Sequence, residues 1–194
     1  MRVALTLIIL SLLLLAVAAL YDVNYINYES KRPYAKWAKI NFYDFKGFKK
    51  PGMKLHGLAE FAYIKTDRRI RYLRNGNVEV TTYFYPSRSY VFAQDIRNPD
   101  LLRHELYHFH IAEYFSRLLR RTILQQKNDI TRSTIQRVNR EYYILEEQMQ
   151  QQYDEDSYHS YVLHEQRKWE TKVDSLLYSL RNFSDPIVLL ANKE

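Results

Sequence analysis

His104-Glu105-Leu106-Tyr107-His108 is the stretch of the sequence that says most about both the fold and the chemistry. On an α-helix, two histidines four residues apart stand about 40° apart around the axis, so both imidazoles can reach one metal ion. A glutamate directly after the first histidine lies beside the position where water would bind. This pattern is typical of a zinc hydrolase, in which two histidines hold the metal and a carboxylate takes a proton from water.

The surrounding residues predict that this pentad lies near the start of a long helix. Asn98 is suited to the N-cap, Pro99 to the first helical position, and an acidic residue follows in the first turn. Farther along, one stripe recurs at steps of three and four residues and includes both histidines: Leu101, His104, His108, Ile111, Phe115 and Leu118. Buried imidazoles need polar partners, and a shared cation satisfies two of them at once. The alternative is a pair of core histidines bonded to backbone or tyrosine.

A third ligand is expected from the C-terminal half. A helix predicted to start near Ser157 carries an apolar stripe from Val162 to Leu180, and extending that stripe back by three residues reaches His159. We therefore predict one Zn²⁺ per chain, held by three imidazoles with water as the fourth ligand, and Glu105 as the catalytic base. The predicted metal ligands are His104, His108 and His159. No cysteine is present, so the rivals for the third position are carboxylates: Glu113, Glu146, Glu147 and Asp154.

Each of these four rivals has another role open to it. Glu113 lies about half a turn around the helix from His104, which suits a contact behind an imidazole, an ion pair elsewhere or the solvated surface. Glu146 and its neighbour Glu147 are expected on the wet side of their helix. Asp154 could act as a fourth ligand that closes the metal site.

The first twenty residues differ in composition from the rest of the chain. A positive start and an almost wholly apolar run precede Ala16-Val17-Ala18, a small-x-small cleavage pattern, so residues 1–20 are predicted to be a signal peptide. An uncleaved N-terminal anchor is the alternative. Both predict an exported protein, periplasmic or secreted. Residues 21–194 suit a single domain. The formal charge is +7, but the basic residues alternate with acidic ones, so nucleic acid is not an expected partner.

The order of patterns predicts an α+β fold, with a small, mostly antiparallel N-terminal sheet packed on a helical C-terminal half. Asn75-Gly76-Asn77 between two alternating runs is a strong hairpin signal. The strands are predicted at Trp37–Phe45, Leu58–Lys65, Arg69–Leu73, Val78–Tyr85 and Tyr90–Phe92. A substrate peptide could add to an exposed edge of this sheet, which we expect to be the Val78–Tyr85 strand.

Several motifs along the chain resemble a bacterial family of predicted secreted zinc-dependent proteases, catalogued as a domain of unknown function. The shared segments are Asp44-Phe45-Lys46-Gly47, Ser87–Val91, Leu101–Glu113, Tyr153-Asp154 with His159, and Gln166 with Trp169. The resemblance implies a zincin-like fold with the same three histidines and Glu105 in the site. The chain departs from the family pattern at Ser157 and Ser160, where the family has threonine and glycine, and at Tyr90, where it has tryptophan.

Three functions are compatible with these residues. The first is a zinc metalloprotease acting on a peptide or protein substrate, with the oxyanion stabilised by a donor near the third ligand such as Tyr153, Tyr158 or His164. The second is an exported binding or scaffold protein whose zinc is structural. The third is a zinc amidase that acts on cell-wall material.

Overall fold

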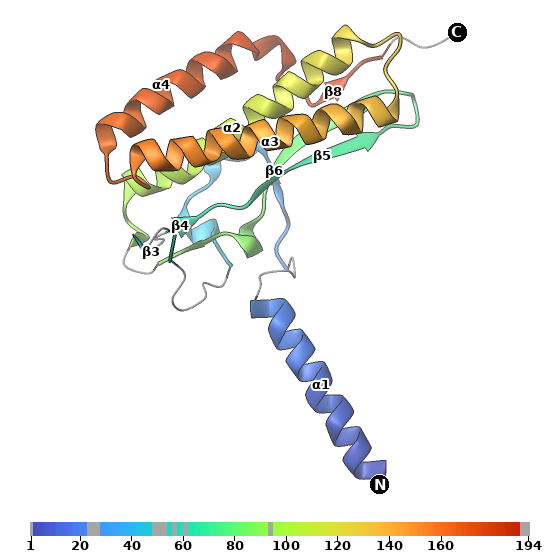
Figure 1. The fold of residues 1–194 in the computed structure, drawn as a ribbon, viewed down its shortest axis with the longest axis vertical. Coiled ribbons are helices and arrows are strands. Elements are labelled where there is room, and N and C mark those ends of the chain that lie inside the picture. Colours follow the sequence, from blue (N-terminus) through green and yellow to red (C-terminus); the bar gives the residue numbers. More distant parts are fainter. Residues whose placement is uncertain are drawn as a thin grey trace.

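The computed structural model describes residues 2–22, 28–47, 54–55, 58–59, 62–92 and 95–190. Three long helices dominate the C-terminal half: α2 (Pro99–Gln125), α3 (Arg132–Ser157) and α4 (Leu163–Ser179). Small antiparallel sheets precede them, so the α+β class predicted from the sequence is confirmed (Figure 1).

The helix ends follow capping rules that are visible in the sequence. The Asn98 side chain accepts hydrogen bonds from the backbone N–H groups of Asp100 and Leu101, both at 3.1 Å, and Pro99 opens α2 as predicted. Thr131 caps α3 by accepting from the Thr134 N–H. The C-cap residue after α3 is Tyr158, whose φ of 50° lies in the left-handed region.

The main sheet is built around the predicted hairpin. Strands β5 (Thr66–Tyr72) and β6 (Val78–Phe84) pair in antiparallel register, and Gly76 turns between them with a φ of 81°. On its other side β6 pairs with β1 (Arg32–Pro33) and with β8 (Ile187–Val188). Strand β6 is therefore central, and the prediction that Val78–Tyr85 forms an exposed edge is wrong.

The remaining strands are short. Strand β4 (Ala62–Tyr63) pairs with β7 (Tyr90–Val91), and β2 (Lys54–Leu55) pairs with β3 (Leu58–Ala59). Residues 60 and 61 of the predicted Leu58–Lys65 strand lie outside the described residues.

Two segments differ from the sequence prediction. The predicted strand Trp37–Phe45 instead contains two 3-10 turns, η1 (Tyr34–Lys39) and η2 (Phe42–Asp44). The predicted third helix does not start near Ser157, because α3 continues to that residue and α4 begins only at Leu163. His159 therefore lies in the connection between two helices and does not head an amphipathic stripe.

Helix α2 is the centre of the molecule. It packs against α3 and α4 on one side and against β5 and β6 on the other, as Figure 1 shows. One apolar cluster joins α2 to α3 and α4, and includes Ile111, Phe115, Tyr153, Trp169 and Val173. A second cluster joins the sheet to α2 and α3 through Val78, Val80, Leu119 and Ile135. The start of α2 is thereby fixed against the end of α3.

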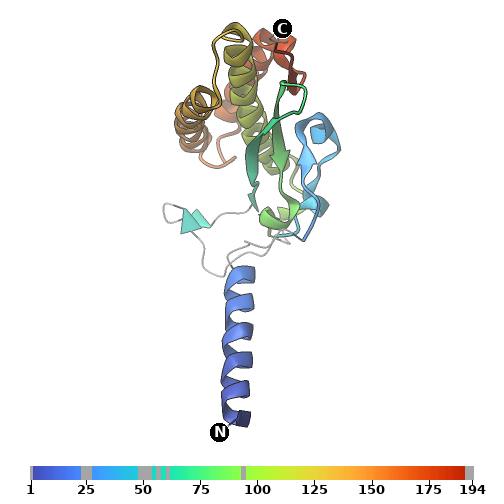
Figure 2. The same cartoon turned by 90° about the vertical axis from the view of Figure 1, so that its right-hand side faces the viewer.

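The N-terminal apolar run forms helix α1 (Arg2–Asp22). Figure 2 shows α1 projecting away from the other helices and the sheet, and its large apolar side chains from Val3 to Val17 are exposed. Within the residues that the structure describes, no helix combines the length and the apolar character that a membrane crossing needs.

Candidate metal centre

The two histidines of the pentad lie where the start of α2 crosses the end of α3. His104 and His108 project from the first turns of α2, and their Nε2 atoms are 3.2 Å apart. Asp154, in the last turn of α3, lies between them: its Oδ1 is 3.1 Å from Nε2 of His104 and 3.0 Å from Nε2 of His108. The structure brings the two predicted histidines together and adds Asp154, which the sequence analysis named only as a rival ligand.

His159 joins this cluster from the connection between α3 and α4. Its Nδ1 is 3.6 Å from Oδ1 of Asp154. The ligand atoms of His104, Asp154 and His159 all lie within 4.8 Å of one another, a spacing that could hold a metal ion. The structure therefore brings His159 close to His104 and Asp154, although the helical argument that led to His159 was wrong.

The backbone that carries His159 has an unusual conformation. Tyr158, His159 and Ser160 have φ values of 50°, 51° and 71°, so three consecutive residues with a side chain are left-handed. Such a conformation costs roughly 1–2 kcal/mol per residue. Glycine at position 160, as in the family pattern, would relieve part of that cost. Hydrogen bonds from the N–H of His159 to the Asp154 carbonyl and from Val162 to the Ser157 carbonyl close this turn.

The walls of the cluster hold the imidazoles in place. The Tyr153 ring stacks on His104 with 4.6 Å between ring centroids, and its hydroxyl donates a long hydrogen bond to the His104 carbonyl. The Gln150 side chain contacts Nδ1 of His108 through its oxygen and donates from its nitrogen to the His108 carbonyl at 3.0 Å. Gln150 was not predicted, although its spacing of four residues from Asp154 could have indicated a shared helix face.

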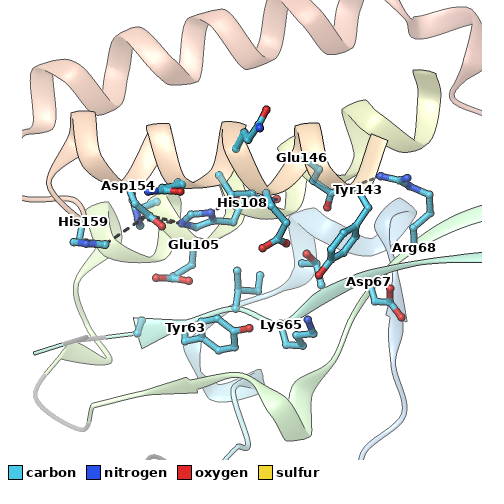
Figure 3. Close-up of a pocket in the computed structure, with 18 of the residues that line it drawn as sticks. Tyr63, Lys65, Asp67, Arg68, Glu105, His108, Tyr143, Glu146, Asp154 and His159 are labelled. Atoms are coloured by element: carbon cyan, nitrogen blue, oxygen red, sulfur yellow. Dashed lines mark hydrogen bonds and ion pairs between the residues drawn. The ribbon is translucent and has the colours of Figure 1, made fainter. Parts of the chain in front are cut away.

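Glu105 lies beside the histidines and is buried, with 4 % of its surface exposed. A cleft of about 600 Å³ opens from this cluster and runs between residues 62–68 and α3. Figure 3 shows Glu105 on the side of the cluster that faces Tyr63, and Asp154 between His108 and His159. The carboxylate of Glu105 therefore lines the same cleft as the imidazoles.

The electrostatics of the cluster separate the two helical histidines. Burial lowers the pKa of His104 to about 4, although Asp154 opposes that shift. Burial would also lower the pKa of His108, but the negative charges of Asp154 and Glu105 outweigh it and raise the pKa to about 9. The pKa of Asp154 lies well below its usual range, because burial is outweighed by His108 and by hydrogen bonds to the histidines. At neutral pH these shifts favour a negative Asp154 carboxylate beside a protonated His108 and a neutral His104, so a divalent cation bound here would replace the proton of His108.

The other carboxylate rivals lie away from the imidazoles. Glu113 is a buried residue of α2. It pairs with Arg120 at 2.8 Å and with Arg117 at 3.1 Å, and its carboxylate accepts a hydrogen bond from the Thr82 hydroxyl at 2.7 Å. The ion-pair interpretation of Glu113 is thus confirmed. Glu146 is buried and pairs with Arg68, so the expectation that it is solvated is wrong. Glu147 is exposed on α3, as expected.

The three candidate oxyanion donors have different surroundings. The hydroxyl of Tyr153 is directed at the His104 carbonyl, whereas Tyr158 is about half exposed. His164 is exposed and pairs with Glu165 at 3.1 Å. None of these contacts identifies an oxyanion donor.

The family motifs nearest the N-terminus contact each other. The backbone N–H groups of Lys46 and Gly47 donate to the carbonyls of Pro86 and Ser89 at 2.9 and 2.7 Å. A Cβ atom at Gly47 would lie 2.8 Å from the Ser89 carbonyl oxygen, so only glycine allows this approach. Comparison with family models, curated proteins and solved structures gave no match. The family resemblance therefore stays a prediction.

Proposed function

We propose that this protein is an exported zinc-dependent hydrolase with a zincin-like site, most simply a metalloprotease. The observation that carries the proposal is the convergence of three imidazoles beside the buried carboxylate of Glu105. His104 and His108 come from one helix and His159 from a distant turn, yet all three contact the same oxygen of Asp154. In this proposal His104, His108 and His159 hold one Zn²⁺.

The chain's own residues would divide the work as follows. When bound, the ion would supply Lewis acidity, which polarises a carbonyl and acidifies water. Glu105 would act as the general base that accepts a proton from water and as the acid that returns it to the leaving amine. Gln150 would hold the ring of His108 by its contact with Nδ1. Tyr153 would limit the movement of His104 by stacking on it.

The cleft supports a peptide or protein as substrate. Its walls are the extended segment 62–68 and α3, and it leads to the imidazoles and Glu105. An extended chain suits a cleft with one extended wall. A zinc amidase acting on cell-wall material is compatible with the same residues, and a screen of both substrate types would separate the two activities.

An exported scaffold with a structural zinc is the second candidate, favoured by Asp154 because a fourth protein ligand would close the site. Glu105 favours the enzyme, since a structural site does not need a buried base beside its ligands. Both candidates assume that residues 1–20 act as an export signal, and neither calls for a nucleic-acid partner.

The replacement Glu105→Gln tests the enzyme directly. It removes the base but keeps the shape of the side chain, so we expect unchanged zinc content and a loss of roughly 10²–10⁴-fold in kcat on whichever substrate the parent cleaves. Glu141→Gln changes an exposed α3 side chain outside the cleft lining, so it is the matched control and should keep full turnover. If Glu105→Gln turns over substrate like the parent, the hydrolase proposal is wrong.

A further inference from the structure

The ligand atoms of the cluster form a compact triangle. Nε2 of His104, Nε2 of His108 and Oδ1 of Asp154 are separated by 3.2, 3.1 and 3.0 Å. Zinc bonds of about 2.0–2.1 Å in a tetrahedron place neighbouring ligand atoms about 3.3 Å apart. The carboxylate oxygen therefore has the spacing of a ligand that shares one ion with both imidazoles. Nδ1 of His159 lies 3.6 Å from the same oxygen, and the ligand atoms of His159, Asp154 and His104 all lie within 4.8 Å of one another.

The identity of the contacting nitrogens separates a ligand from a supporting carboxylate. A supporting carboxylate accepts from the ring nitrogen that faces away from the metal. On His108 that nitrogen is Nδ1, and it contacts Gln150. On His104 it is Nδ1 as well, which is buried and has no hydrogen-bond partner among the described residues. Asp154 instead contacts Nε2 on both rings, the two atoms that face each other.

Building on the proposed zinc site, we propose that Asp154 is a displaceable fourth ligand that closes the metal centre in the resting protein. Three imidazoles and one carboxylate complete a tetrahedron and leave no position for water. Glu105 then has no water to deprotonate until the Asp154 carboxylate moves away. The resting protein is thus a latent hydrolase, controlled by a side chain of its own.

Asp154 is placed so that it can leave without disturbing the fold. It lies in the last turn of α3, and its side chain is 23 % exposed, compared with 2 % for His104. It also lines the cleft through which a substrate would enter. Rotation about its side-chain bonds would carry the carboxylate toward the solvent in that cleft, while the backbone of α3 stays in place.

Cobalt substitution of the full chain provides a readout that does not depend on turnover. Co²⁺ reports its coordination in the visible spectrum, and azide is an exogenous anion that binds only at an open position. The parent is compared with Asp154→Ala and with Asp154→Asn, which keeps the shape of the side chain. Glu155→Gln makes the same charge change one residue farther along α3, on an exposed side chain, and is the matched control.

We expect the parent and Glu155→Gln to bind Co²⁺ and to respond weakly to azide. Both Asp154 variants should bind Co²⁺ and show an apparent azide affinity at least about tenfold higher, since the open form is then no longer a minor state. His159→Ala should lose most of its Co²⁺.

Equal azide responses in the parent and both Asp154 variants would overturn the inference but leave the metal site intact. Loss of Co²⁺ from the Asp154 variants with retention in His159→Ala would make Asp154 an obligatory ligand, which also overturns it. A parent that binds no Co²⁺ would remove the proposed function itself.

Discussion

At the scale of single residues, the turn that carries His159 combines a poor backbone conformation with a chemical role. Its three left-handed residues, Tyr158, His159 and Ser160, are held by the two helices that flank them. Strain of this kind persists where the surrounding structure determines the conformation, and it is often found at functional sites. Here it turns an imidazole back toward the end of α3.

Ser160→Gly should stabilise the protein. Glycine adopts a φ of 71° without the steric cost that serine carries, and this gain exceeds the extra entropy of the unfolded chain, so we expect about 0.5–1 kcal/mol in the free energy of unfolding. The measurement is denaturant unfolding. Ser184→Gly is the control, because Ser184 is exposed and has a φ of −73°, where glycine should destabilise. If both variants shift stability in the same direction, the strain argument does not hold.

The sequence predicts individual site residues only where local geometry decides their position. His104, His108 and Glu105 follow from the helical period and the Asn98 cap, and the structure has them as predicted. The central position of Asp154 depends on how far α3 continues and on how it crosses α2. Those are tertiary facts, so the carboxylate was predicted only as one rival among four.

At the scale of elements, a buried ion pair joins the edge of the hairpin to α3. Arg68 on β5 contacts Glu146, and it also donates to Asn139 at 2.8 Å and to Ser116 at 3.0 Å. This pair fixes the distance between the two walls of the cleft. Burial raises the pKa of Glu146 to about 7, although Arg68 opposes the shift.

This shift predicts a pH-dependent stability that Glu146→Gln removes. The folded pKa lies above the unfolded value of 4.5, so the folded protein binds the proton more tightly and stability falls as the pH rises from 4.5 to 7. We expect the parent to lose on the order of 1–3 kcal/mol across this window relative to the variant. Chemical unfolding at several pH values measures the slope. Glu155→Gln, a change of an exposed side chain farther along α3, should keep the parent's slope, and the same slope in Glu146→Gln would contradict the prediction.

The sequence predicts whole elements with similar limits. The β5–β6 hairpin and the start of α2 follow from turn and capping residues, which act over a few positions. The segment Trp37–Phe45 misled the prediction because its apolar alternation resembles a strand. A local capping box decides the second of its two turns, η2: the Asn41 side chain accepts from the Tyr43 N–H, and Asp44 accepts from the Asn41 N–H.

At the scale of the whole molecule, polar contacts add to the apolar clusters that join the helices to the sheet. Arg120 on α2 donates to the Val80 carbonyl on β6, to the Phe183 carbonyl and to Glu113. The imidazole cluster is a second polar centre, and it joins α2, α3 and the turn before α4. A metal ion there would cross-link three segments that a chain without cysteine cannot link covalently.

Zinc should therefore stabilise the folded protein as a whole. An ion that binds only the folded state adds about 2.7 kcal/mol when its free concentration is 100 times its Kd, so Tm should rise with zinc and fall with a chelator. Metal analysis should give about one zinc per chain.

His104→Ala should lose both the zinc and the zinc-dependent change in Tm, because it removes a ligand that is 2 % exposed. His164→Ala is the control, because it removes a solvent-exposed imidazole that pairs with Glu165. This variant should keep both the zinc and the zinc-dependent change in Tm. An equal zinc-dependent rise in Tm for His104→Ala and the parent would place the stabilising ion elsewhere on the molecule.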